Sequence, residues 1–185
     1  MTTDSIVLID IDQQTWGTHL DRARHWLTLT EASQSAFCAL LDSAIGEIGE
    51  PHIRRYLTDM RAQAQRHHDC IPDLLAAFGG PGGQRPGGTT MGRVTAAGRA
   101  LAGAAQGLVG GARGRGYRKL RELLLANQDA IGAFAVTEQL ALAVGLRDAI
   151  AITFPLIREK TTDQLLLQEY LLEMAPKAIL YHADL

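Results

Sequence analysis

The sequence predicts an all-α fold, a four-helix bundle of two antiparallel helical hairpins joined by a long glycine-rich crossover. Only 5% of the 185 residues are aromatic, whereas Ala, Leu, Gln, Glu and Arg, which favour helices over strands, are plentiful. Apolar residues recur at alternating intervals of four and three in several long stretches. The segment GGPGGQRPGG at 79–88 separates the first two predicted helices from the last two, because no helix can cross it.

The composition is that of one ordinary globular domain. Hydrophobic residues make up 46% and charged residues 21%, and 185 residues can build one substantial core but are few for two. The net charge of −2 indicates no general preference for nucleic acid or acidic partners. The apolar run at 6–9 is surrounded by aspartates rather than preceded by basic residues, and no run of about 18 apolar residues occurs. We therefore expect a cytoplasmic protein without a transmembrane segment.

The first hairpin is predicted from two stripes of regularly spaced residues. Residues 1–17 are interpreted as an N-terminal arm, and residues 18–185 as a single four-helix-bundle domain. A helix from about 20 to 48 carries the stripe Leu27, Glu31, Gln34, Cys38, Leu41, Ile45 and Ile48. After the helix-breaking motif GEIGEP, a second helix carries the stripe Ile53, Leu57, Met60, Ala64, His67, Ile71, Leu74 and Phe78.

The crossover is predicted over residues 79–116. Its part 91–112 is rich in small residues, with Gly103, Gly107 and Gly111 four apart, a spacing that permits close helix packing. Arg99 leaves too short an apolar run to span a bilayer, so this part is interpreted as a tightly packed helix or a mobile segment.

The crossover is also basic. Between residues 78 and 121 the chain has no acidic residue and eight basic ones, which are Arg85, Arg93, Arg99, Arg113, Arg115, Arg118, Lys119 and Arg121. This run is interpreted either as a solvated linker or as a surface for an anionic partner such as nucleic acid or an acidic membrane.

The second hairpin is predicted from helices at about 117–144 and 147–181, separated by VGLRD. Pro176 marks a point where the last helix should kink or fray. Its predicted inward stripe consists of Ile152, Leu156, Glu159, Asp163, Leu166 and Tyr170.

Two adjacent histidines in the second helix raise the question of a metal site. His67 lies on the apolar stripe and is expected to be buried, whereas His68 lies about 100° round the helix. Residues equally far from a hairpin turn lie at similar heights, which places four carboxylates near the level of His67. Di-metal bundles supply such carboxylates and imidazoles. The candidate ligands for iron or manganese are therefore His67, Glu159, Asp163, Asp129 and Glu31.

Simpler interpretations of these candidates stay open. A lone core histidine is commonly hydrogen-bonded to a neighbouring helix. Glu31 has the spacing of a capping box, in which it would stabilise a helix start. Glu159 and Asp163 have basic neighbours, as on a solvated face, and Asp129 lies off the main apolar stripe.

Two stretches resemble the YciE/YciF-type bacterial stress proteins of the ferritin-like superfamily. They are EPHIRRYLTDMRAQAQRHHDCIPDLLAAFGG and VGLRDAIAITFPLIREKTTDQLL, and the similarity covers roughly residues 28–80 and 117–175. The resemblance implies a ferritin-like four-helix bundle, often a homodimer, whose relatives commonly carry a di-iron centre.

The chain departs from the E-x-x-H pattern of that superfamily. His67 falls on the histidine of the second helix, but Ala64 replaces its glutamate. Glu159 falls on the glutamate of the fourth helix, Thr162 replaces its histidine, and Gln34 stands near the position expected in the first helix. The resemblance therefore implies a stress-related bundle with a degenerate or lost di-metal site, holding iron, manganese or no metal. The alternative is a non-catalytic interaction module that binds an anionic partner through the basic crossover.

Overall fold

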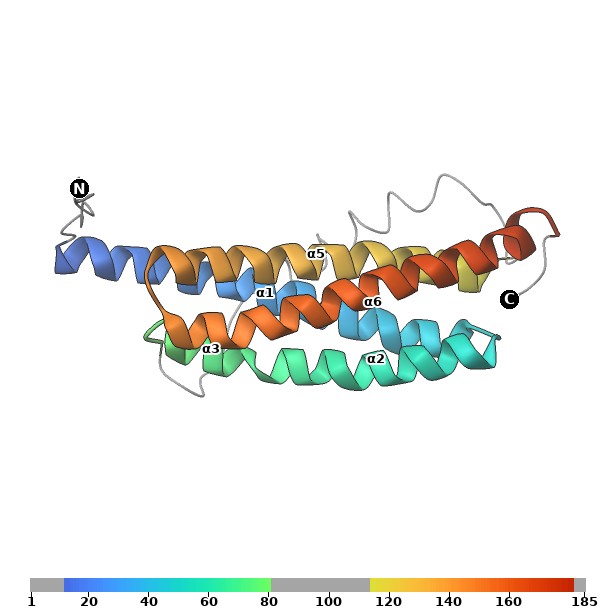
Figure 1. The fold of residues 1–185 in the computed structure, drawn as a ribbon, viewed down its shortest axis with the longest axis horizontal. Helices are drawn as coiled ribbons and strands as arrows, with labels where there is room; N and C mark the ends of the chain where they lie inside the picture. Colours follow the sequence, from blue (N-terminus) through green and yellow to red (C-terminus); the bar gives the residue numbers. More distant parts are fainter. Residues whose placement is uncertain (1–11, 81–113, 182–185) are drawn as a thin grey trace, which may run out of the picture.

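The computed structural model describes residues 12–80 and 114–181. Within these two ranges the chain forms α-helices joined by short turns, and no strand. The helices are α1 (Gln13–Glu47), α2 (Pro51–Asp69), α3 (Ile71–Ala77), α5 (Arg115–Ala143) and α6 (Arg147–Ile179). Because α3 follows directly on α2, the helices make four rods, which lie side by side in Figure 1. The prediction of an all-α fold with four long helices is confirmed.

Helix α1 begins earlier than the sequence predicted. The side chain of Asp12 accepts a hydrogen bond from the backbone N–H of Thr15 at 2.9 Å and so caps the helix, which starts inside the segment predicted as an arm. Residues 1–11 lie outside the described residues. Since α1 is continuous through Glu31, the capping-box interpretation of that glutamate is wrong.

The stripe predicted for the second helix is confirmed residue by residue. All eight of its members are buried, His67 among them, whereas His68 is more exposed. The rod is interrupted at Cys70, because Pro72 has no N–H to donate to the carbonyl of His68. The stripe nevertheless continues into α3, so the core face of the rod survives the break.

Helices α5 and α6 form a tight hairpin around Gly145. That glycine has a φ of 70°, a left-handed conformation that L side chains rarely adopt, and the N–H of Leu146 closes the turn on the carbonyl of Ala141 at 2.8 Å. Helix α6 continues through Pro176 and ends at Ile179, so this proline does not terminate it.

The rods surround one elongated core. Helix α1 packs against α2 and α5, and α6 packs against α5 and α2, which leaves α1/α6 and α2/α5 as the diagonal pairs. Contacts between Trp26 and Ala133 and between Ser33 and Asp129 show that α1 and α5 are antiparallel. The end of α3 and the start of α5 lie at opposite ends of the molecule (Figure 1). Most of the predicted crossover, residues 81–113, lies outside the described residues.

None of the described helices is both long and apolar enough to cross a membrane. A cytoplasmic location stays a prediction.

Candidate functional site

A layer of buried polar side chains divides the core. One apolar cluster lies toward the α1–α2 turn and includes Leu41, Leu57 and Leu123, and a second lies toward the α5–α6 turn and includes Leu27 and Phe134. Between the clusters each rod contributes a polar residue that is at most 6% exposed, and these are Gln34, His67, Asn127, Lys160 and Asp163. Buried polar groups lower stability unless they are hydrogen-bonded, so the contacts of this layer decide what it can do.

His67 and Glu159 bridge α2 and α6. Their side chains meet at 2.8 Å, and Gln63 donates a second hydrogen bond to the same carboxylate oxygen at 2.7 Å. Burial lowers the pKa of His67, and the hydrogen bonds from His67 and Gln63 lower the pKa of Glu159. At neutral pH the imidazole is therefore neutral and donates its Nε2–H to a charged carboxylate, which can only accept. The pair is a satisfied hydrogen bond at the edge of the layer, because half of the Glu159 side chain is exposed, 50%.

Asp163 lies deeper and is held by a tyrosine from α2. The Tyr56 hydroxyl donates to Oδ1 of Asp163 at 2.7 Å. Burial raises the pKa of Asp163, while the hydrogen bond from Tyr56 and the charge of Lys160 oppose this rise. Burial and the neighbouring carboxylate raise the pKa of Tyr56 as well, so the phenol remains a proton donor.

Lys160 places a charged ammonium in the middle of the bundle. Its side chain has no exposed surface, and Nζ lies 4.4 Å from the ring centroid of Phe37 and 6.0 Å from that of Phe134. It donates one long hydrogen bond, to Oδ1 of Asn127 at 3.4 Å. Burial lowers the pKa of Lys160 to about 8, so the amine still carries its charge at neutral pH.

Two polar atoms of the layer have no hydrogen-bond partner among the described residues. Gln34 donates from Nε2 to the carbonyl of Ala64 at 2.7 Å, but its Oε1 is buried and unpaired. Nδ1 of His67 is likewise buried and unpaired. Oε1 of Gln34 can only accept a hydrogen bond, and so can Nδ1 of a neutral His67 whose proton is on Nε2. The layer therefore lacks hydrogen-bond donors rather than acceptors.

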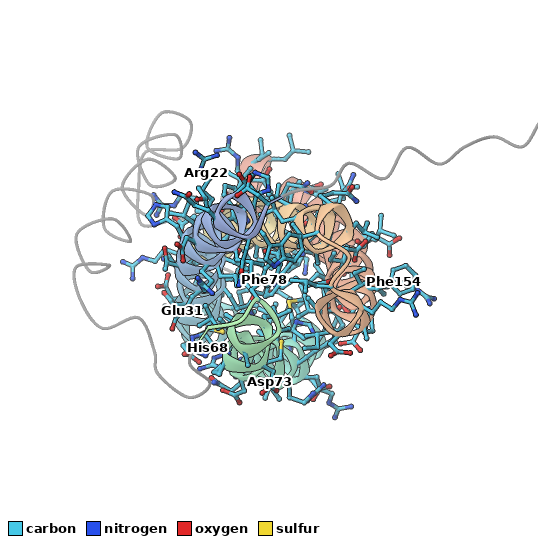
Figure 2. All side chains as sticks on the ribbon, turned by 90° about the vertical axis from the view of Figure 1, so that its left-hand side faces the viewer. Arg22, Glu31, His68, Asp73, Phe78 and Phe154 are labelled. Carbon is cyan, nitrogen blue, oxygen red and sulfur yellow. The ribbon has the colours of Figure 1, made fainter. Side chains whose placement is uncertain are left out.

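The predicted ligands do not gather at one point. His67 and Glu159 are in contact, and Asp163 belongs to the same layer. Asp129 is exposed and accepts a hydrogen bond from the Ser33 hydroxyl at 2.7 Å on the surface between α1 and α5. Glu31 is not among the buried residues and lies at the outer edge of α1 in Figure 2. Distances from the hairpin turns predicted which carboxylates lie near the level of His67. They could not predict whether each carboxylate points toward the core or toward solvent.

Sequence reasoning missed Lys160 and Asn127. On α6 it predicted inward positions at Ile152, Glu159 and Leu166, whereas the buried residues are the next ones along the chain, Thr153, Lys160 and Leu167. The buried positions of α6 include Thr153, Leu156, Lys160, Asp163 and Leu167, which also alternate by three and four. This second stripe has the same regular spacing in the sequence, but an inward lysine is unusual because burying its charge lowers stability. Glu159 therefore flanks the core, whereas Lys160 occupies it.

The donor set does not fit an iron or manganese centre. Di-metal carboxylate bundles use a glutamate from each of two helices and a Glu-x-x-His motif from each of the other two. The inward positions in this chain are Gln34, Ala64, His67, Asn127, Lys160 and Asp163, which supply one imidazole, one carboxylate and one cation. In the part of the chain that the structure describes, no group of three or more His, Cys, Asp and Glu side chains is placed to hold a metal ion.

No protein-family model, curated protein or solved structure matches this chain. Its function must therefore be inferred from the contacts of the polar layer and from the surface around it.

Proposed function

We propose that this chain is a ferritin-like bundle that has lost its di-metal centre and works as a non-catalytic interaction module. The observation that carries the proposal is the buried ammonium of Lys160, which supplies the positive charge that a metal would bring to the centre of such a bundle. The positive charge of Lys160 is balanced within the layer by Asp163, which is the one buried carboxylate there.

Three further features support a ferritin-like origin. The two hairpins are antiparallel, and α3 ends at the end of the bundle opposite to the start of α5, as a long crossover between hairpins requires (Figure 1). The four rods contribute their buried polar residues at one level. Ala64 and His67 occupy the two positions of a Glu-x-x-His motif on α2. On α6 the inward pair with this spacing is Lys160 and Asp163, one residue beyond Glu159 and Thr162, the positions that the resemblance implies.

Electrostatics makes metal binding unfavourable in this layer. A divalent ion about 6 Å from the Lys160 ammonium would be repelled by roughly 5 kcal/mol at an effective dielectric constant of about 20. Neutral amides stand at Gln34 and Asn127, where carboxylates would have to offset this repulsion. The layer therefore stabilises one fixed ammonium and disfavours additional positive charge.

Metal analysis tests this proposal. The protein is purified without chelator, exposed anaerobically to Fe(II) or to Mn(II), and freed of excess ion by gel filtration before its metal content is measured. We expect far less than one ion per chain in the unmodified protein and in His67→Ala alike. A stoichiometric metal that His67→Ala removes would contradict the proposal.

A matched variant tests the role of the ammonium itself. Lys160→Glu places a carboxylate beside Asp163 and His67, and we expect it to bind more Mn(II) than the unmodified protein, with helix content checked by circular dichroism. No gain in a folded Lys160→Glu variant would show that the ammonium is not what excludes the metal.

The partner that the sequence favours for such a module is anionic. Four of the eight basic residues of the crossover region lie in the described part, at the start of α5, where Gly114 caps the helix without a side-chain hydrogen bond. An uncapped helix N-terminus attracts anions. Lys119 pairs with Glu122 at 3.0 Å. The arginines are the residues to test, because a guanidinium can bind a phosphate through two hydrogen bonds at once.

Binding of a short DNA duplex, used as a polyanion probe, tests this part of the proposal by fluorescence anisotropy. If about four phosphates are contacted, affinity should fall roughly 100-fold between about 50 and 200 mM salt. Replacing Arg113, Arg115, Arg118 and Arg121 together by glutamine should abolish binding without changing helix content. Undetectable binding by the unmodified protein at low salt would leave the basic run as a solvated linker.

A further inference from the structure

Helix α6 exposes a row of large apolar residues on the side facing away from the core. Phe154, Leu165, Leu172 and Ile179 are 54%, 61%, 64% and 51% exposed. Figure 2 shows Phe154 at the periphery of the bundle, pointing away from it. Single exposed apolar residues are ordinary on protein surfaces, whereas several aligned on one side of a helix favour an interaction site.

The spacing of this row is that of a helix–helix seam. Leu165, Leu172 and Ile179 are seven residues apart, and from Phe154 to Leu172 one set of exposed positions on the same side of the helix alternates by four and three. The seam, called here the outer row, consists of Phe154, Arg158, Thr161, Leu165, Gln168 and Leu172. It lies nearly opposite the buried stripe of α6 on the helix, at about 100° per residue. Helix α6 therefore has apolar residues on two sides. One side packs on the core, and the other faces away from the bundle.

Two charges accompany the outer row. Arg158 belongs to it, and Glu169 lies directly beside it; both are exposed, and neither forms an ion pair within the described residues. The guanidinium of Arg158 lies 6.0 Å from the ring centroid of Phe154, which leaves its hydrogen-bond donors free for a partner.

We propose that a second copy of this chain docks on the outer row, with the two α6 helices antiparallel about a twofold axis near the level of Asp163. In this register Phe154 faces Leu172 of the second copy, and Thr161 faces Leu165. The same register brings Glu169 of the second copy to within one residue of the level of Arg158, on the same edge of the row, so one register serves both the apolar and the charged contacts.

This self-complementarity is the reason for choosing a second copy as the occupant. A twofold interface uses one surface twice, so each residue must find its complement within the same surface. A parallel pairing of the two helices would instead place Arg158 against Arg158 and Glu169 against Glu169, which like-charge repulsion disfavours. From Phe154 to Leu172 the row is about 27 Å long at 1.5 Å per residue. An interface of this length is modest, so the dimer is concentration-dependent, with a dissociation constant in the micromolar range.

Sedimentation velocity of the full chain at about 1 to 200 µM tests the proposal directly. The unmodified protein should shift from monomer to dimer over this range. Leu165→Glu should be monomeric throughout, because it would bury a carboxylate in the seam. Val136→Glu is the matched control: Val136 is 40% exposed on α5, away from the outer row, and its replacement should leave the dimer intact.

A charge swap tests the register. Arg158→Glu alone, or Glu169→Arg alone, should weaken the dimer at least tenfold, because either change sets like charges face to face at two symmetry-related positions. The double variant Arg158→Glu/Glu169→Arg should restore the affinity of the unmodified protein.

Three outcomes would overturn the proposal. One is a monomer at every concentration, the result expected if another segment of the same chain covered the outer row. The others are a Leu165→Glu variant that dimerises normally and a double swap that stays as weak as its single members. None of these outcomes depends on metal content or on the anion-binding test, so this inference and the proposed function fail independently.

Discussion

Replacing Lys160 by methionine removes a charge from the core while keeping an unbranched side chain of similar length. Lysine titrates at 10.5 in an unfolded chain, whereas burial lowers the pKa of Lys160 to about 8 in the folded protein. Between these two values the unfolded state binds the proton more tightly. The stability of the unmodified protein should therefore rise as the pH is raised through this window.

The size of the effect follows from the shift. A difference of about 2.5 pKa units is equivalent to roughly 3 kcal/mol of unfavourable ionisation free energy, fully present below pH 8 and reduced to about 1 kcal/mol at pH 10. The Lys160→Met variant lacks this dependence. Relative to the variant, the unmodified protein should gain about 2 kcal/mol of unfolding free energy between pH 7 and pH 10.

The assay is urea unfolding followed by circular dichroism at both pH values. All other titratable groups are common to both proteins, so most of their contribution to the pH dependence is removed by taking the difference. Lys177→Met is the matched substitution outside the core, because Lys177 is 47% exposed and pairs with Glu50. The effect of Lys160→Met on the pH dependence should exceed that of Lys177→Met. An identical pH dependence of the unmodified protein and Lys160→Met would refute a charged Lys160 in the core.

Two further predictions concern Tyr56 and His67, which lie near Lys160 at the interface between α2 and α6. Tyr56→Phe removes the donor to buried Asp163 and should lower the unfolding free energy by about 1 to 3 kcal/mol at pH 7, as measured in urea. Tyr170→Phe should change it by less than about 0.5 kcal/mol, and equal effects would contradict the assigned hydrogen bond. Burial lowers the pKa of His67 below 6.5, so below that pH the unfolded state binds more protons and stability falls as the pH is lowered from 7 to 5. His67→Gln should flatten this part of the pH profile, and the same loss in both proteins would argue against a buried neutral imidazole.

The second rod shows where periodicity is a sufficient guide. Every member of the stripe from Ile53 to Phe78 is buried, because one apolar face with a strongly polar remainder leaves only one way to turn the helix. The prediction that His67 is buried and His68 more exposed follows from the same stripe and is confirmed.

Helix α6 shows where periodicity is ambiguous. It carries one stripe through Glu159 and another through Lys160, and both stripes include Leu156 and Asp163. Glu159 and Lys160 themselves point about 100° apart on the helix. It also carries the apolar outer row on a third side. Hydrophobicity counted along this helix therefore could not select the inward face.

The sequence by itself determined the all-α fold, the hairpin turns and the inward face of the second rod, because these follow from local propensity, glycine and proline positions and one unambiguous apolar stripe. Only the tertiary structure decided which face of α6 is buried in the core. Phe37 from α1 and Phe134 and Asn127 from α5 surround the Lys160 ammonium with two rings and one amide oxygen, and residues so distant in the sequence meet only when the rods pack. Helical spacing gives the height and rotation of a side chain on its own helix. The free energy of burying a charge depends on what the other helices bring to that point, and packing therefore determined which polar residues entered the core.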